Sequence, residues 1–159
     1  MNRRTALTLA TASLASSLLA CHASAQSPAD IDAVKAADAK FYATLSARDA
    51  KTMEGLWANK PSVVNIGPVS KTIAVGYTDA VAMYWTNAFT NVFAELSVTM
   101  TTTQVQTDGK VAWVIGTENA TGKTKAGAPL AFATFVTNIY EKDGNRWLMV
   151  SHHAGMQPK

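Results

Sequence analysis

The stretch FATFVTNIYEKDGNRWLMVSHHAG, from Phe132 to Gly155, decides the fold. It contains two runs of β-branched, aromatic and aliphatic residues on either side of Asp143-Gly144. An Asp-Gly pair favours a two-residue hairpin turn, because glycine adopts a positive φ without a steric penalty. The stretch therefore predicts two long antiparallel strands joined by a tight turn.

Strict alternation along the two strands predicts which side chains share a face. One face of the first strand is expected to carry Val136, Asn138 and Tyr140. In the second strand His152 shares a face with Leu148 and Val150, and His153 shares the opposite face with Trp147. Both faces are largely apolar, so we expect helices and a cavity on one side and a second sheet or a second subunit on the other.

The residues before the hairpin predict helices first and strands afterwards. Ser27 is a suitable N-cap, Pro28 suits the first helical position, and apolar residues then recur with helical spacing at Ile31, Val34, Phe41 and Leu45. A short helix after Asp49 and a third helix over 78–91 follow, with short strands near 62–66 and 71–75. From Leu96 the apolar period changes to two, and Asp108-Gly109 predicts a second hairpin.

This order predicts an α+β domain in which a curved antiparallel sheet forms a cone around three N-terminal helices. Side chains that point into such a cone converge on one apolar cavity, which is a common setting for a small-ligand site.

The first 25 residues are typical of an export signal, which leaves residues 26–159 as one domain. Arg3-Arg4, an apolar run from Ala6 to Ala20 and Ala23-Ser24-Ala25 follow one another in the order of such signals. We expect cleavage after Ala25 and a periplasmic or secreted protein, exported by the general secretory route or the twin-arginine route. The apolar run is too short to favour a membrane span.

Cys21 is the single cysteine of the chain and has two interpretations. In Leu18-Leu19-Ala20-Cys21 it would take a lipid anchor, whereas cleavage after Ala25 would discard it with the signal. We favour the second interpretation, because Ala-Ser-Ala follows directly. The mature protein would then contain no disulfide and no thiol nucleophile.

The charge of the chain argues against a nucleic-acid partner. The net charge is +3, from 14 basic and 11 acidic residues. Removal of Arg3 and Arg4 leaves 12 basic residues and the same 11 acids, and the remaining lysines form no stripe interleaved with aromatic residues. His152 and His153 are predicted to point to opposite faces, so we expect neither a metal site nor a cofactor.

Motifs along nearly all of the mature chain resemble the nuclear transport factor 2-like superfamily, and more narrowly its SnoaL-like branch. The residues that carry the resemblance are Phe41 to Leu45, Asp49, Met53, Leu56-Trp57-Ala58, Ile66-Gly67-Pro68, Gly76, Trp85, Ala112-Trp113, Thr137-Asn138, Asp143-Gly144, Trp147 and His152-His153-Ala154. The resemblance implies the cone-shaped fold. It leaves activity open, because this superfamily includes isomerases, dehydratases, cyclases, non-catalytic binders and oligomerisation modules.

The resemblance also bears on single residues. The end of the chain is similar to the association domain of calcium/calmodulin-dependent protein kinase, whose basic pocket positions correspond here to the uncharged Ile115, Asn138 and Ala154. Similarity to ketosteroid isomerase implies that Tyr42 is an oxyanion donor, but no Asp or Glu corresponds clearly to the catalytic base.

The candidate catalytic residues are His152, Tyr42 and Asp38. Asp38 lies near the apolar stripe of the first helix, where it serves either the site or an ion pair with Lys35 or Arg48. A histidine in a concave wall transfers protons near neutral pH, or else it bonds a backbone carbonyl as part of the core.

A surface position is expected for Glu118, because it has the opposite parity to Trp113 and Ile115. The candidate ligand-binding residues are Trp57, Trp85, Phe89, Trp113, Ile115 and Asn138. The aromatic members form either a ligand cage or ordinary core. Asn138 needs a partner in a buried strand, either a ligand or a neighbouring helix.

The sequence thus favours an exported protein that binds a small, mostly apolar or aromatic molecule and forms a homodimer sheet to sheet. One hypothesis is an isomerase, dehydratase or cyclase that uses general acid–base chemistry without a metal. The alternative is a non-catalytic periplasmic binding or oligomerisation module. The sequence leaves open whether the protein is an enzyme.

Overall fold

The computed structural model describes residues 27–158. The predicted signal peptide and Cys21 lie outside the described residues. Within them, no helix has both the length and the apolar character needed to cross a membrane.

The described chain begins with helices, as the sequence predicts. Their bounds are α1 Pro28–Ala47, α2 Ala50–Glu54, and a continuous helical segment made of η1 Thr78–Met83, α3 Tyr84–Asn87 and η2 Ala88–Val92. The Ser27 hydroxyl accepts a hydrogen bond from the Asp30 N–H (3.4 Å) at the start of α1, and Arg48 ends the helix in the left-handed region with φ 55°. At the start of α2, the Asp49 carboxylate accepts a hydrogen bond from the Thr52 N–H (3.0 Å).

A six-stranded sheet follows. Its strands are β1 Val64–Ile66, β2 Ala74–Val75, β3 Phe93–Thr107, β4 Val111–Thr124, β5 Pro129–Asp143 and β6 Arg146–Met156, in the order β2-β1-β6-β5-β4-β3. The α+β class and the curved sheet are as predicted. The four long strands are antiparallel, as predicted, and the short β1 makes the sheet mixed because it lies parallel to β6. No tight turn joins these two strands, and the long intervening chain allows a parallel pair.

The hairpin predicted around Asp143-Gly144 forms between β5 and β6. Asp143 pairs with Arg146, so the two turn residues are Gly144 and Asn145, one position later than predicted. Gly144 has φ 59°, which is the conformation that makes glycine suitable there.

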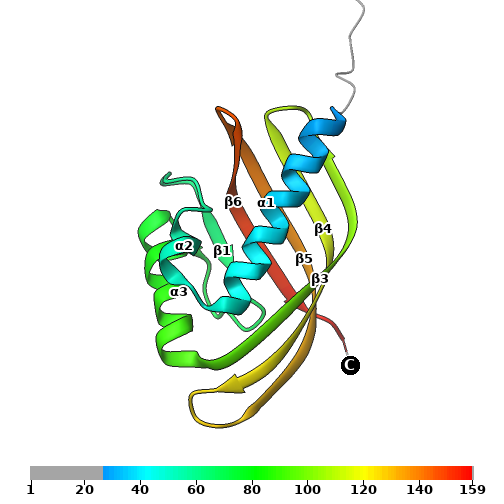
Figure 1. Ribbon diagram of the computed structural model, residues 1–159. Helices are drawn as coiled ribbons and strands as arrows, with labels where there is room; N and C mark the ends of the chain where they lie inside the picture. The colour runs from blue at the N-terminus through cyan, green and yellow to red at the C-terminus, as the bar shows by residue number, and fades with distance from the viewer. Residues whose placement is uncertain (1–26, 159) are drawn as a thin grey trace, which may run out of the picture.

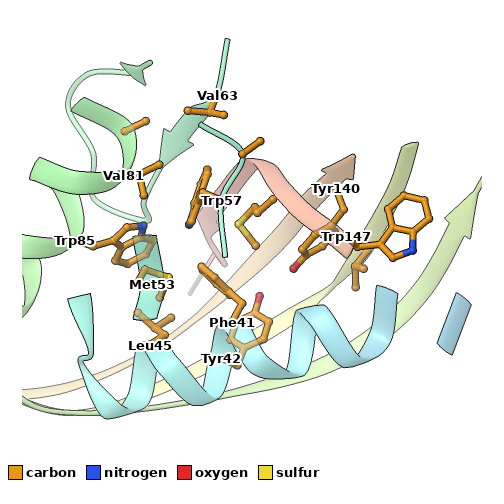
Figure 2. Close-up of a cluster of buried hydrophobic side chains, with 14 of the residues drawn as sticks. Phe41, Tyr42, Leu45, Met53, Trp57, Val63, Val81, Trp85, Tyr140 and Trp147 are labelled. Carbon is orange, nitrogen blue, oxygen red and sulfur yellow. The ribbon is translucent and has the colours of Figure 1, made fainter. Parts of the chain in front are cut away.

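Helix α1 lies across the concave face of the sheet, and α2 and α3 gather beside β1 at one end of it (Figure 1). Between them is one apolar core, to which α1 contributes Phe41, Tyr42 and Leu45. Figure 2 shows these side chains facing Trp57, Trp85 and Tyr140 from other elements. The core therefore joins α1 both to the sheet and to the third helical segment.

The buried face of β4 is the one opposite to its bulky residues Trp113 and Ile115. The buried residues are Ala112, Val114, Gly116, Glu118 and Ala120, and each lies opposite an inward residue of β5. Trp113 is only partly buried, and Ile115 is 36% exposed on the convex face. The expectation that Glu118 lies on the surface is therefore wrong. Three of these five inward residues are small, and two of them, Ala112 and Ala120, belong to the apolar core.

A β-bulge in β6 changes the alternation predicted for that strand. Ile139 pairs with Ser151 but Tyr140 pairs with Met149, which leaves Val150 as the extra residue. Trp147 and Met149 consequently turn inward on the same side as His152, and the prediction that Trp147 shares a face with His153 is wrong. His152 is buried and His153 is exposed, as alternation beyond the bulge requires.

Candidate functional site

Seven buried polar residues form one hydrogen-bonded cluster between α1 and the sheet, which we call the polar network. Helix α1 supplies Asp38 and Tyr42, and strands β4, β5 and β6 supply Glu118, Thr134, Asn138, Tyr140 and His152. Each of these residues is at most 5% exposed. Burial of so many polar groups is tolerated only when they are paired with one another.

Asn138 lies at the centre of the polar network. Its Nδ2 donates to Asp38 Oδ1 (2.8 Å) and to Tyr42 Oη (3.0 Å), and its Oδ1 lies 2.8 Å from His152 Nδ1. The Tyr140 hydroxyl donates a further hydrogen bond to Asp38 Oδ1 (2.8 Å). Of the two partners considered for Asn138, a ligand or the neighbouring helix, the structure shows the helix, through Asp38 and Tyr42.

Glu118 is the site residue that sequence reasoning missed. Its Oε1 accepts a hydrogen bond from the Tyr42 hydroxyl (2.8 Å), and its Oε2 accepts one from the Thr134 hydroxyl (2.8 Å). The signal that would have found it is the hairpin register, in which Glu118 lies opposite Thr134 and two residues beyond the small Gly116. The network thus contains two carboxylates, one at each end.

Burial determines how these groups titrate. It raises the pKa of Asp38 above its ordinary value, with the Glu118 charge adding to the rise and the bonds from Asn138 and Tyr140 opposing it. Burial also raises the pKa of the Tyr42 and Tyr140 phenols, so both remain protonated donors. Asp38 accepts no hydrogen bond from Lys35 or Arg48 among the described contacts, so the ion pair considered for it does not form.

Burial lowers the pKa of His152, and nearby His153 lowers it further, while the charge of Glu118 raises it. The imidazole is consequently neutral near pH 7 and able to accept a proton.

A pocket of about 70 Å³ opens beside the network on the concave side, and we call it the concave pocket. Its wall is mostly apolar and includes Leu45, Trp85, Ala88, Phe93, Leu96, Val98, Ala120 and Phe132. Glu118 and His152 are the two ionisable network members that line it. An apolar wall with a few convergent polar groups is the usual form of a small-ligand site.

The six predicted ligand-binding residues do not come together in this pocket. Trp85 lines it, and Phe89 stacks behind Trp85 with ring centroids 5.6 Å apart. Trp57 is 3% exposed in the core, and its backbone forms an isolated parallel β-bridge with Met149. Asn138 lies behind the wall as part of the polar network.

Ile115 and Trp113 lie on the outward-facing side of β4. Ile115 lines a groove of about 420 Å³ on the convex face, with Thr103, Thr117, Phe135, Thr137 and His153 among its neighbours. This convex groove is separate from the concave pocket, so the two residues do not serve the same site as Trp85.

Asp38 borders a second opening on the other side of α1. This lateral pocket, of about 340 Å³, lies between α1 and strands β3 and β4, and Lys35, Tyr42 and Met100 also line it. Asp38 Oδ2 accepts no hydrogen bond from any residue between 27 and 158. Of the three predicted catalytic residues, only His152 lines the concave pocket, and the network connects it to Tyr42 and Asp38.

Comparison with known families and structures identifies the domain. A family model for the SnoaL-like domain matches residues 34–157. The chain belongs to the SnoaL-like family. The resemblance stated from the sequence is thereby confirmed.

Three solved structures illustrate the fold. A protein of the nuclear transport factor 2-like family from Streptomyces avermitilis, proposed to be a dehydratase, is 22% identical with a TM-score of 0.72, covering 82% of this chain and 98% of its own. A proposed calcium/calmodulin-dependent protein kinase type II association domain from Thiobacillus denitrificans is 27% identical with a TM-score of 0.67, covering 78% and 94%. A ketosteroid isomerase-like protein from Erwinia carotovora atroseptica is 18% identical with a TM-score of 0.70, covering 84% and 100%. A comparison with curated proteins gives no match.

The polar network predicts an unequal effect of two tyrosine substitutions. Tyr42→Phe deprives Glu118 of a donor and leaves one Asn138 bond unmade, so it should lower the free energy of unfolding by about 2–3 kcal/mol. Tyr77→Phe removes one bond to the Glu54 carbonyl and should cost only about 1 kcal/mol. Urea unfolding measures both, and equal losses would show that the network is not a principal source of stability.

Proposed function

We propose that the protein binds a small, mostly apolar molecule in the concave pocket and transfers a proton on it by general acid–base chemistry. The observation that carries this proposal is the presence of Glu118 and His152 together in a wall that is apolar apart from them and Tyr84. Isomerisation or loss of water is the class of reaction that such a pair supports, since both need proton removal and proton return without a redox step.

His152 is the proposed base, because burial keeps its imidazole neutral near pH 7. Glu118 stabilises the imidazolium that forms when His152 accepts a proton, since its charge favours the protonated histidine. The Tyr42 hydroxyl donates to Glu118 and keeps that carboxylate oriented at the wall. The proton then returns from His152 to another atom of the bound molecule.

A non-catalytic binding or oligomerisation module is the alternative, and the small volume of the pocket favours oligomerisation, because little of the interior is open to a ligand. Sites for drug-sized ligands measure roughly 300–1,000 Å³, whereas the concave pocket measures about 70 Å³. In this conformation it admits only a molecule of a few non-hydrogen atoms. In either case we propose that the protein acts outside the cytoplasm, in agreement with the signal-like residues 1–25.

A test of proton transfer uses cyclopentanone, a small apolar ketone with exchangeable α-protons. Wild-type protein should accelerate their exchange in heavy water, which NMR follows. His152→Gln keeps a polar side chain but removes the base, and it should lower the protein-dependent rate about 100-fold. His153→Gln alters the neighbouring histidine on the convex face and should leave the rate unchanged. Binding without exchange would select the non-catalytic alternative, and equal losses in both variants would contradict the role of His152.

The same exchange rate should depend on pH in a defined direction. Because burial lowers the pKa of His152 below 6.5, the rate should stay constant as pH falls through 6.5 and decline only at lower pH. The lowered pKa of His152 also decreases the free energy of unfolding as pH falls below 6.5, because the unfolded chain binds a proton more readily than the folded protein does. A rate that falls with a midpoint above 6.5 would contradict the assignment.

We further propose that the convex face pairs with a second copy of the chain. Phe135 is 60% exposed on this face, and Ile115 and His153 border the same groove as Phe135. An apolar patch on the open face of a sheet often marks a site of protein–protein contact.

Light scattering after size exclusion tests the pairing. Wild-type protein should have the mass of a dimer, and Phe135→Asp should weaken association about 30-fold or more, as expected for loss of a central interface residue. Val69→Asp changes an 80% exposed residue in the loop between β1 and β2 and should not alter the mass. A monomeric wild type would contradict the proposal.

A further inference from the structure

We propose that Asn138 is a positioning residue that holds neutral His152 in the form protonated on Nδ1, so that an unprotonated Nε2 is available at the concave pocket. The catalytic consequence of this inference rests on the proposed function. The evidence for the tautomer itself is the direction of the hydrogen bonds in the polar network. A neutral imidazole carries one proton on either nitrogen, and the bond made by one nitrogen decides the state of the other.

The Asp38 end of the network fixes the orientation of the Asn138 amide. Asp38 Oδ1 lies 2.8 Å from the Asn138 amide and also accepts from the Tyr140 hydroxyl. A carboxylate oxygen only accepts, so the Asn138 atom beside it must be the donor Nδ2. An amide rotated by 180° would place two acceptor oxygens against each other inside the core.

The Glu118 end gives the same answer independently. Tyr42 has one hydroxyl proton, which it donates to Glu118 Oε1 (2.8 Å). Its oxygen can therefore only accept from Asn138, 3.0 Å away, and the atom that donates must again be Nδ2. Two carboxylates at opposite ends of the network thus require the same amide orientation.

Both requirements leave Asn138 Oδ1 facing His152 Nδ1 at 2.8 Å. Because Oδ1 only accepts, Nδ1 must carry the proton, and in a neutral ring Nε2 then has a free lone pair. Nε2 forms no hydrogen bond with the part of the chain that the structure describes. Asn65 is paired with His152 across β1 and β6, but it uses its Nδ2 to bond the Ala80 carbonyl instead.

Packing keeps the ring in this orientation. The His152 ring lies 5.3 Å from the Phe41 ring and 6.2 Å from the Trp85 ring, measured between centroids. His152 lines the concave pocket, whereas Asn138 does not, so the amide acts on the pocket only through the imidazole.

A neutral amide has one advantage over a carboxylate at this position. A carboxylate bonded to Nδ1 would stabilise the imidazolium and raise the pKa of His152. The amide selects the same tautomer without adding charge, so the imidazole remains an available base near neutral pH. Asn138 therefore sets the proton position, while burial sets the charge.

Long-range proton–nitrogen correlation NMR of the nitrogen-labelled protein above pH 7 tests the assignment directly. Neutral His152 should show a protonated Nδ1 and an unprotonated Nε2. His153 is exposed and provides a comparison in the same spectrum, where it should show an averaged mixture of the two tautomers. A protonated Nε2 on His152 would overturn the proposal.

Two variants test whether Asn138 determines the tautomer of His152. Asn138→Leu removes the acceptor, so the Nε2-protonated form should become the majority and the cyclopentanone exchange rate should fall at least about tenfold. Asn138→Asp keeps an acceptor and should raise the pKa of His152, which the same spectra report and which serves if the leucine variant does not fold. An unchanged tautomer in Asn138→Leu, or an unchanged pKa in Asn138→Asp, would overturn the role of Asn138. An Nδ1-protonated His152 in a protein without exchange activity would instead uphold the tautomer and remove the proposed function.

Discussion

The burial of the Asp38 carboxylate between α1 and the sheet is the constraint on which the rest of the site depends. A carboxylate at 3% exposure has lost most of its hydration, so it needs donors from the protein. Asn138 and Tyr140 supply them from β5, and the donor in Asn138 reaches Tyr42 as well. Helix and sheet are thus joined by directional bonds in addition to apolar packing, and this fixes the height and rotation of α1 over the concave face.

Helix α1 lies between the concave pocket and the lateral pocket. The concave pocket lies on the side of Glu118 and His152, and the lateral pocket lies on the side of Asp38. A Cβ at Gly116 would lie 2.2 Å from the carbonyl oxygen of Thr101 in β3, so only glycine fits at this point of the β3–β4 pair.

The sequence predicts the elements well and the site only partly, for a physical reason. Turn residues, caps and apolar periods are local signals, and they place the helices and the hairpins. The inward face of β4 depends on tertiary packing, which a local pattern does not report. The large Trp113 and Ile115 suggested that their own face is buried, and this placed Glu118 on the surface. The bulge at Val150 also cannot be predicted from local sequence, because it depends on how β6 pairs with Ile139 and Tyr140. His152 points inward opposite Asn138, but the bulge places Trp147 and Met149 on its side of the sheet in place of the predicted Leu148 and Val150.

Native mass spectrometry of the purified protein tests most directly whether the concave pocket holds a small apolar molecule. Ala120 is buried in the pocket wall, and its exposed neighbour Ala131 lies on the adjacent strand, so leucine at each position makes a matched pair. We expect a small-molecule adduct, retained or added as cyclopentanone, on wild-type protein and on Ala131→Leu, and its loss from Ala120→Leu. The absence of any adduct on wild-type protein, or its persistence in Ala120→Leu, would contradict a ligand site in the concave pocket.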